Sequence, residues 1–257
     1  MTPDPSAILV DRRGGVLLLQ LNRPEKRNAL ATPVLLAVAE ALRDAADDDA
    51  VGAVVMTGGD RIFAAGADIG ELEASTSDDP VESPRYLAWQ AIRAFPKPLL
   101  AAVEGWCLGA GAELMMCCDI VVAAKDARIG QPETNLGIIP GAGGTALLPR
   151  LVGPAVAMDM VLTGEPISAQ RAYNLGLVAR VTEPGSAIAE ALELAAKIAS
   201  RAPKALAQAK ASVRAALDTP LSAHIRDERQ RFISLLGGDE MREGIAAFRD
   251  KRPPLWR

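Results

Sequence analysis

The sequence predicts an α/β protein in which strands and helices alternate and a helical region follows. Two observations carry this prediction. Short apolar runs alternate with segments of helical apolar spacing in the first part of the chain. From Pro154 onward, helical spacing dominates. The 257 residues are 49% apolar and 23% charged, enough for one α/β unit with a helical appendage. We divide the chain into a core over residues 1–195 and a helical C-terminal region over 196–257.

The first predicted elements are two strands and a helix. Apolar runs at residues 7–10 and 16–21 flank Arg12-Arg13-Gly14-Gly15, which predicts a hairpin. Thr32 precedes Pro33, so we expect its hydroxyl to cap a helix whose first position the proline occupies. The residues that form one apolar face of this helix are Leu35, Val38, Ala39, Leu42 and Ala46.

Buried strands and a long loop follow. A strand over residues 51–56 leads into a loop over 60–83, small and apolar in its first half and polar in its second. A helix is expected from Ser83-Pro84 to about Phe95. Apolar runs at 99–103 and 120–124 predict two strands, and LGAGAELMMCCD between them predicts a turn into a short buried helix.

The C-terminal part predicts six helices and one strand. The helices are expected at residues 154–163, 168–175, 186–201, 203–217, 221–236 and 239–249. Gly176 and Gly237 stand where helix C-caps belong. Residues 177–181 predict the further strand.

Charge and hydropathy exclude several kinds of partner. Lys plus Arg is 28 and Asp plus Glu is 32, a net charge of −4, and no long basic run occurs. We therefore expect no nucleic-acid partner. No apolar run approaches the roughly 18 residues of a membrane span, so no membrane partner is expected. The first residues lack a basic segment before an apolar one, which predicts no signal peptide.

Cysteine and histidine usage narrows the chemistry. Cys107, Cys117 and Cys118 form neither a disulfide framework nor a CxxC metal motif, and they favour a cytoplasmic location. The one histidine, His224, lies in a helical segment, where we expect a solvated or capping side chain rather than a catalyst. A zinc site built on several histidines is excluded, and no metal site is expected. Proton transfer would then fall to carboxylates.

Two stretches in the first third could bind a ligand. LNRPEKRNAL, residues 21–30, is either a solvated basic turn or an anion site that uses Arg23, Lys26 and Arg27 before the next helix. FAAGADIGEL, residues 63–72, is either a tight packed turn or a segment whose small residues let a ligand approach the backbone.

Two later stretches contain glutamates. In GWCLGAGAE, residues 105–113, the Ala110 N–H could face an anionic oxygen, and Glu113 follows one turn later, where a glutamate also simply compensates the helix dipole. In IGQPETNLGIIPGAGG, residues 129–144, apolar neighbours would raise the pKa of Glu133 and let it hold a proton near neutrality. The glycines of the second stretch lack the Lys-Ser/Thr pair of a P-loop and could equally form a turn into the next helix.

Together these stretches resemble the enoyl-CoA hydratase/isomerase superfamily, also called the crotonase family. The motifs that carry the resemblance are NRPxxxNAL, FAAGADIxEL, LGAGAELxxxCDI, GQPExxLGIIPGAGG and EGIAAFxxKRxP, in this order from residue 22 onward. The resemblance implies a crotonase-like right-handed spiral of ββα units with a C-terminal helical trimerisation region. It also implies a homohexamer, assembled as a dimer of trimers.

The resemblance assigns roles to particular residues. The backbone N–H groups of Ala67 and Ala110 would form an oxyanion hole for a thioester oxygen, although many members have glycine at the second position. Glu113 would help deprotonate the attacking water, and Glu133 would deliver a proton to the α-carbon. The residues implied to contact substrate or CoA are Lys26, Arg27, Ala29, Ala65, Asp68, Ile69, Gly141, Phe248 and Lys251.

The two glutamates favour one branch of this family. They imply an enoyl-CoA hydratase, which adds water reversibly and in the syn sense across the 2,3 double bond of a trans-2-enoyl-CoA. The alternatives are an enoyl-CoA isomerase and a CoA-ester-binding protein without activity. The overall pattern is most similar to hydratases of bacterial phenylacetate degradation, which implies 2,3-dehydroadipyl-CoA as a possible substrate. No cofactor is expected, because CoA is part of the acyl-CoA substrate.

Overall fold

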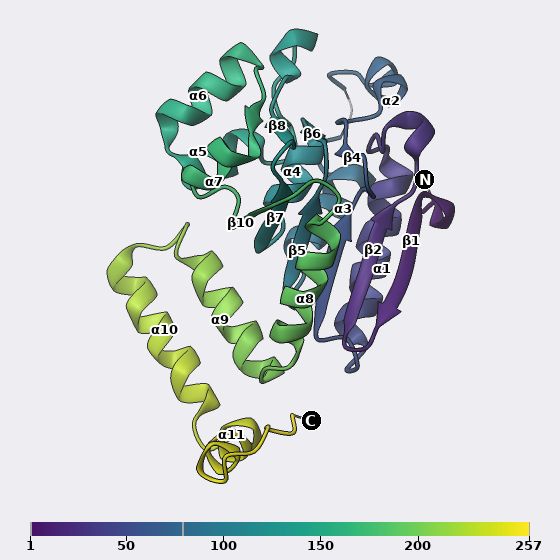
Figure 1. Ribbon diagram of the computed structural model, residues 1–257. Coiled ribbons are helices and arrows are strands. Elements are labelled where there is room, and N and C mark those ends of the chain that lie inside the picture. The colour runs from purple at the N-terminus through teal and green to yellow at the C-terminus, as the bar shows by residue number, and fades with distance from the viewer. Residues whose placement is uncertain (1, 79, 257) are drawn as a thin grey trace.

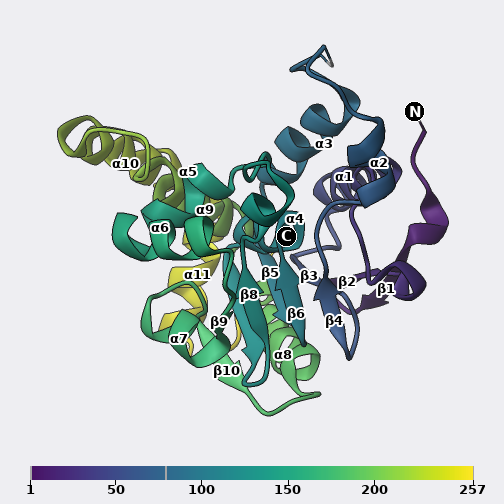
Figure 2. The same ribbon diagram turned by 90° about the horizontal axis from the view of Figure 1, so that it is seen from above.

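The protein is built on two sheets, seen in the computed structural model, which describes residues 2–78 and 80–256 (Figures 1 and 2). The first sheet has the strand order β1-β2-β3-β5-β7-β10. Its strands are β1 (Ile8–Arg13), β2 (Val16–Leu21), β3 (Ala53–Thr57), β5 (Leu99–Val103), β7 (Ile120–Ala124) and β10 (Arg180–Thr182). Only the edge strand β1 runs antiparallel to its neighbour within the described residues.

The second sheet is smaller and has the order β4-β6-β8-β9. Its strands are β4 (Ile62–Ala64), β6 (Trp106–Leu108), β8 (Arg128–Gly130) and β9 (Ile167–Ser168). The first three pair in parallel, and β9 closes the edge in the antiparallel sense.

The chain passes from the first sheet to the second and then into a helix, three times in succession. β3 and β4 lead to α2 (Ile69–Ala74) and α3 (Pro84–Arg93), β5 and β6 lead to α4 (Ala110–Met116), and β7 and β8 lead to α5 (Gly144–Val152). Because β3, β5 and β7 are neighbours in one sheet and β4, β6 and β8 in the other, the units stack on one another. These are the ββα units that the sequence resemblance implies.

Two glycines allow the sharp passage between the sheets. A Cβ at Gly58 would lie 2.1 Å from the carbonyl oxygens of Ile62 and Phe63. Gly105 has φ +58°, and a Cβ there would lie 2.0 Å from the carbonyl oxygen of Arg61. No other residue type fits these corners without a shift of the backbone.

The first sheet is covered on both faces. Along β3, Val54 and Met56 face the main core, which also holds the apolar faces of α1 (Thr32–Asp47) and α3. Val55 and Ala53 face the opposite side, where α8 (Ala187–Ala199) presents Ala187, Ala191 and Ala195 at spacings of four. This alternation is the period of two that buries both faces of a strand.

Helix α1 confirms most of one prediction and corrects a detail. Its predicted face is buried at Leu35, Val38, Ala39 and Leu42, and half-buried at Ala46. Thr32 does not cap the helix, because it is already the first helical residue and Ala31 is the N-cap. Its hydroxyl and its N–H instead donate to Glu71, so the hydroxyl serves a tertiary contact.

Other elements also differ from the sequence predictions, among them the short strands β6, β8 and β9, which had not been predicted. Residues 60–83 are not one loop, since they contain β4 and α2. The strand predicted over 177–181 forms later, as β10, after a buried turn. Residues 144–152, with Pro149 inside, form α5, a helix whose range was not among the predicted ones. His224 is buried on α10 (Leu221–Leu235), not solvated.

The C-terminal helices lie within their predicted ranges. Besides α8 and α10 they are α6 (Pro154–Thr163), α7 (Ala169–Asn174), α9 (Pro203–Ala215) and α11 (Asp239–Arg249). Gly176 and Gly237 follow helix ends with φ +82° and +71°, as C-cap glycines do. Across the described part of the chain, no helix combines the length and the apolar character needed to cross a membrane.

Helices α9, α10 and α11 form an arm that projects from the sheets (Figure 1). We call these helices the C-terminal arm. Its exposed apolar side chains include Val213, Leu221, Ile225, Phe232, Ile233 and Phe248. The predicted division after residue 195 falls within α8, and the arm itself begins at α9.

Candidate active site

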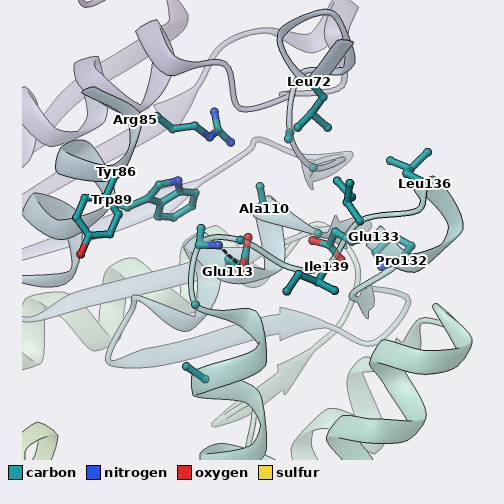
Figure 3. A pocket seen from close by; sticks show the side chains of 18 of the residues that line it. Leu72, Arg85, Tyr86, Trp89, Ala110, Glu113, Pro132, Glu133, Leu136 and Ile139 are labelled. Atoms are coloured by element: carbon teal, nitrogen blue, oxygen red, sulfur yellow. Dashed lines mark hydrogen bonds between the residues drawn. The ribbon is translucent and has the colours of Figure 1, made fainter. Parts of the chain in front are cut away.

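A cleft of about 680 Å³ lies between α3, α4 and the segment that precedes α5. Figure 3 shows Arg85 and Trp89 on one side, Glu133 and Ile139 on the other, and Glu113 between them. The predicted site residues that line this cleft are Ala65, Ala67, Ile69, Ala110, Glu113, Glu133 and Gly141. They come from three segments of the sequence, which the ββα units bring together.

Glu113 lies in the first turn of α4, a helix whose residues are all buried. Glu113 is only 2% exposed. Its Oε1 accepts hydrogen bonds of 2.7 Å from the N–H groups of Ala142 and Gly144. Burial raises the pKa of Glu113, while these two amides oppose the rise. The backbone around the start of α5 therefore fixes the position of the Glu113 carboxylate.

Arg93 supports the same segment. Its Nη1 donates to the carbonyl oxygen of Ala142 over 2.9 Å. Its positive charge, like that of Arg85, also favours the ionised form of Glu113 and limits the rise in its pKa. The chain thus surrounds one buried carboxylate with backbone donors and cations.

Glu133 begins a 3₁₀ helix, Glu133–Leu136, and is 9% exposed. The pKa of Glu133 is raised to about 7, mainly by burial; the negative charge of Glu113 adds to the rise, and the residue's own backbone N–H opposes it. The raised pKa agrees with the sequence prediction, although the apolar residues that prompted it, Leu136, Ile138 and Ile139, are themselves exposed. A pair of nearby carboxyl groups shares protons as a unit.

Gln131 is a site residue that sequence reasoning missed. It is buried, and its amide nitrogen lies 3.0 and 3.1 Å from the two carboxyl oxygens of Glu133 when the amide is oriented so that donors meet acceptors. It therefore orients Glu133. The signal was available, because Gln131 precedes Glu133 by two residues and a buried carboxyl group needs a donor.

The amide of Ala67 lies on the loop before α2, and the amide of Ala110 is the first of α4. Each follows a glycine with positive φ, Gly66 at +127° and Gly109 at +52°. A Cβ at Gly109 would lie 3.7 Å from the Gly66 Cα and 3.0 Å from Glu133 Oε1, so the two segments and the carboxyl group meet here. Within the described residues neither amide donates to an acceptor of the chain. Two free N–H groups thus line the cleft beside Glu133.

The LNRPEKRNAL segment borders the cleft without lining it. The N–H of Ala65 donates to the Arg27 carbonyl over 3.0 Å, and the N–H of Leu30 donates to the Gly66 carbonyl over 2.8 Å. These bonds hold the loop that carries Ala67. Of the predicted contact residues, Lys26, Arg27 and Ala29 lie beside this loop, and their contacts to CoA stay predictions.

Asn28 and Asp68 fix the geometry around this loop. The buried Asn28 has φ +54°, and its Nδ2 donates to the carbonyl oxygens of Gly58, Ile62 and Phe63. Asp68 accepts from the Gly70 N–H and pairs with Arg23 over 3.2 Å. Sequence reasoning missed Asn28. Sequence reasoning placed Asp68 among the residues that contact substrate or CoA. In the structure the Asp68 carboxylate caps α2 and pairs with Arg23, and Asp68 does not line the cleft.

Phe248 and Lys251 lie outside this cleft, at the end of the C-terminal arm. Phe248 is 85% exposed. We predicted that these two residues contact the CoA bound to a neighbouring subunit, and this contact stays a prediction.

The fold and the cleft define a class of protein: an acid–base enzyme. One carboxyl group holds a proton near neutrality, a second carboxylate is fixed next to it, and two free amides can stabilise a developing oxyanion. Within the described residues, no group of three His, Cys, Asp or Glu side chains could hold a metal ion.

The comparisons with known proteins identify the family within that class. The family model described as enoyl-CoA hydratase/isomerase matches residues 11–257, and the chain belongs to this family. The 2,3-dehydroadipyl-CoA hydratase of Escherichia coli (strain K12) is 45% identical, over 97% of this chain and 98% of the relative. The mitochondrial enoyl-CoA hydratase of Pongo abelii is 43% identical, over 95% and 86%.

A solved structure confirms the fold. The crystal structure of an enoyl-CoA hydratase from Polaromonas sp. JS666 matches with a TM-score of 0.92 and 38% sequence identity, over 97% of this chain and 99% of that chain. The crotonase-type spiral of ββα units that the motifs imply is therefore the fold of this protein.

Proposed function

We propose that this protein is an enoyl-CoA hydratase that adds water across the 2,3 double bond of a trans-2-enoyl-CoA to give a 3-hydroxyacyl-CoA. The observation that supports this most is the meeting of Glu113, Glu133 and two free amides in one cleft. Hydration needs a base, an acid and a sink for negative charge, and these groups supply all three.

The proposed reaction conserves protons and electrons. The Ala67 and Ala110 N–H groups bind the thioester oxygen and stabilise the enolate that forms as water adds to C3. Glu113 accepts one proton from that water, and Glu133 gives one to C2. Both carboxyl groups act from the same face, so the addition is syn. Proton exchange between the two groups or with solvent restores the starting state, and the reverse sequence dehydrates the product.

The glutamate pair supports hydration over the two alternatives. A double-bond isomerisation moves one proton from carbon to carbon, and a single carboxyl group can do this. Here the second carboxylate, Glu113, is fixed by two hydrogen bonds of 2.7 Å in the same cleft, as the activation of water requires. A CoA-ester-binding protein without activity would not need a buried carboxyl group whose pKa is raised to about 7 at Glu133.

The test is the incubation of the full chain with crotonyl-CoA. We expect the absorbance of the conjugated thioester to fall reversibly, with one water added to the product by mass spectrometry. An isomerase would convert a longer trans-2-enoyl-CoA to the 3-enoyl ester without a change in mass. An unchanged substrate would contradict the proposal.

The chain supplies the acid, the base and the oxyanion donors itself, and we propose that it needs no resident cofactor or metal.

The finer substrate role that we propose comes from the relative named for 2,3-dehydroadipyl-CoA, an ester whose acyl chain ends in a carboxylate. We also propose that Ala65 and Ile69, which line the cleft, bind the CoA part through backbone groups. Gly141 would line the acyl part.

The C-terminal arm supports an assembly of six copies, as a dimer of trimers. An isolated chain exposes apolar side chains of α9, α10 and α11, and such surfaces are typical of contacts between subunits. We expect light scattering of the full chain to give the mass of a hexamer that does not change on moderate dilution. A monomer at all concentrations would contradict this prediction.

We propose a cytoplasmic location. Cys107, Cys117 and Cys118 are free thiols, and Cys107 and Cys117 are buried without any bridge. Thiols that stay reduced are typical of a reducing compartment.

A further inference from the structure

Trp89 has a polar group without a partner at the wall of the cleft. The residue lines the cleft, is 3% exposed, and its indole Nε1 has no hydrogen-bond acceptor among the described residues. Most buried polar groups have a partner, and one that lacks it marks a place where a ligand can supply it. An indole N–H can only donate, so the missing partner is an acceptor.

Arg85 lies one turn before Trp89 on α3, on the same face of the helix, and also lines the cleft. Its side chain is 27% exposed. Nη1 donates to the Leu30 carbonyl over 2.9 Å and to Glu71 over 3.3 Å. Within the described residues, Nε and Nη2 have no acceptor, and together they form the edge of a guanidinium that binds a carboxylate with two hydrogen bonds.

Glu71 does not satisfy the positive charge of Arg85 by itself. Its two carboxylate oxygens also accept from the N–H and the hydroxyl of Thr32, so its charge is shared among three donors. The Arg85 side chain is only 27% exposed, and this burial lowers its pKa, whereas Glu71, Glu113 and Asp68 favour its charged form. An additional anion at the free edge would therefore find a cation with unused donors.

Most of the other side chains that line the cleft are apolar, apart from Ser83, Tyr86, Arg93 and the two glutamates. The apolar side chains include Leu72, Val81, Leu136, Ile138, Ile139 and Leu147. Figure 3 shows Arg85 and Trp89 together on the wall across the cleft from Glu133, with Leu136 and Ile139 on the side of Glu133. A purely aliphatic acyl chain would cover the donors of Arg85 and Trp89 and leave them unpaired, which is unfavourable.

We propose that Arg85 and the Trp89 indole N–H bind a terminal carboxylate on the acyl chain, so that the preferred substrates are short ω-carboxylated 2-enoyl-CoA esters. This inference rests on the proposed hydratase activity and names the residues that would select its substrate. Arg85 binds through Nε and Nη2, and Trp89 gives a third donor. Neither residue takes part in the proton transfers.

The test compares two substrates of equal length. 2,3-Dehydroadipyl-CoA and trans-2-hexenoyl-CoA both have six acyl carbons, and only the first ends in a carboxylate. We expect Arg85→Met to lower kcat/KM for the acid by about 10–100-fold relative to the neutral ester, mainly through KM, because a hydrogen-bonded charge is lost. Trp89→Phe, which removes the N–H and keeps an aromatic ring, should lower this ratio by about 3–10-fold.

Two controls separate recognition from structure. Arg85→Lys keeps a charge beside Glu71 but lacks the planar fork, so its ratio should fall between those of the wild type and Arg85→Met. Arg43→Met removes an exposed arginine from α1 and should leave both substrates unchanged. If Arg85→Met fails to fold, Trp89→Phe alone still tests the site.

The outcomes distinguish this inference from the proposed function. Equal losses with both substrates in Arg85→Met and Trp89→Phe would show a merely structural role and overturn the inference. A wild-type enzyme that hydrates both esters with equal kcat/KM would also overturn it, while the hydratase assignment would stand. No hydration of either ester would overturn both.

Discussion

Replacement of Glu133 by Gln should lower kcat for hydration by about 10²–10⁴-fold, because the amide cannot give a proton to C2. Glu113→Gln should cost a similar factor, since an amide cannot accept a proton from water. Both side chains keep nearly the same shape, so binding of a saturated acyl-CoA should remain. Steady-state kinetics and calorimetric titration measure the two effects. Full activity in either variant would remove that residue from the mechanism.

The pH dependence provides a second check on Glu133. With a pKa of about 7 it is protonated below neutrality and ionised above, so the hydration rate of the wild type should fall as the pH rises through about 7. The same shift affects folding. The folded state binds this proton more tightly than the unfolded chain, whose pKa is near 4.5, so this contribution to stability is lost as the pH rises from about 4.5 to about 7. Thermal unfolding of Glu133→Gln should lack this decline.

Replacement of Ala110 by Pro should lower kcat by about 10²–10³-fold, the usual cost of one oxyanion donor. Ala110 is the first residue of α4, a position that tolerates proline because its N–H has no helical partner. The substitution therefore removes the N–H that we assign to the thioester oxygen while the helix can still form. Hydration kinetics at saturating substrate measure the loss.

Ala110→Gly is the matched control, because it removes a methyl group and keeps the N–H. It should retain most of the activity. Circular dichroism of both variants checks that α4 and its surroundings remain folded. If Ala110→Pro is folded and as active as Ala110→Gly, the Ala110 amide is not part of the oxyanion site.

Much of the fold was predictable from local patterns. The strand over residues 99–103 and the helix capped by Ser83 are set by a continuous apolar run and by a hydroxyl before a proline, and both form as expected. Elements of the second sheet were missed because strands of three residues, such as Trp106–Leu108, are too short for a period of two to stand out. Pro149 hid α5, because proline inside a helical pattern normally ends it.

The site was predictable to the extent that motifs mark it. Glu113 and Glu133 were found through their segments, and the cleft holds both. Arg85, Trp89 and Gln131 were not found, because their importance comes from tertiary burial. An arginine and a tryptophan four residues apart are unremarkable on a helix, until the structure shows one partly desolvated and the other without a partner. The hydroxyl of Thr32 was misassigned because its acceptor, Glu71, is distant in sequence.

The succession of ββα units has a consequence for how such enzymes change during evolution. The two residues that we assign to acyl selection, Arg85 and Trp89, belong to the first unit, whereas Glu113 belongs to the second and Glu133 to the third. Insertions or substitutions between β4 and α3 can therefore alter which acyl group is accepted while the acid–base pair keeps its support. The residues that select the substrate and the residues that carry out the chemistry therefore lie in different units of the spiral.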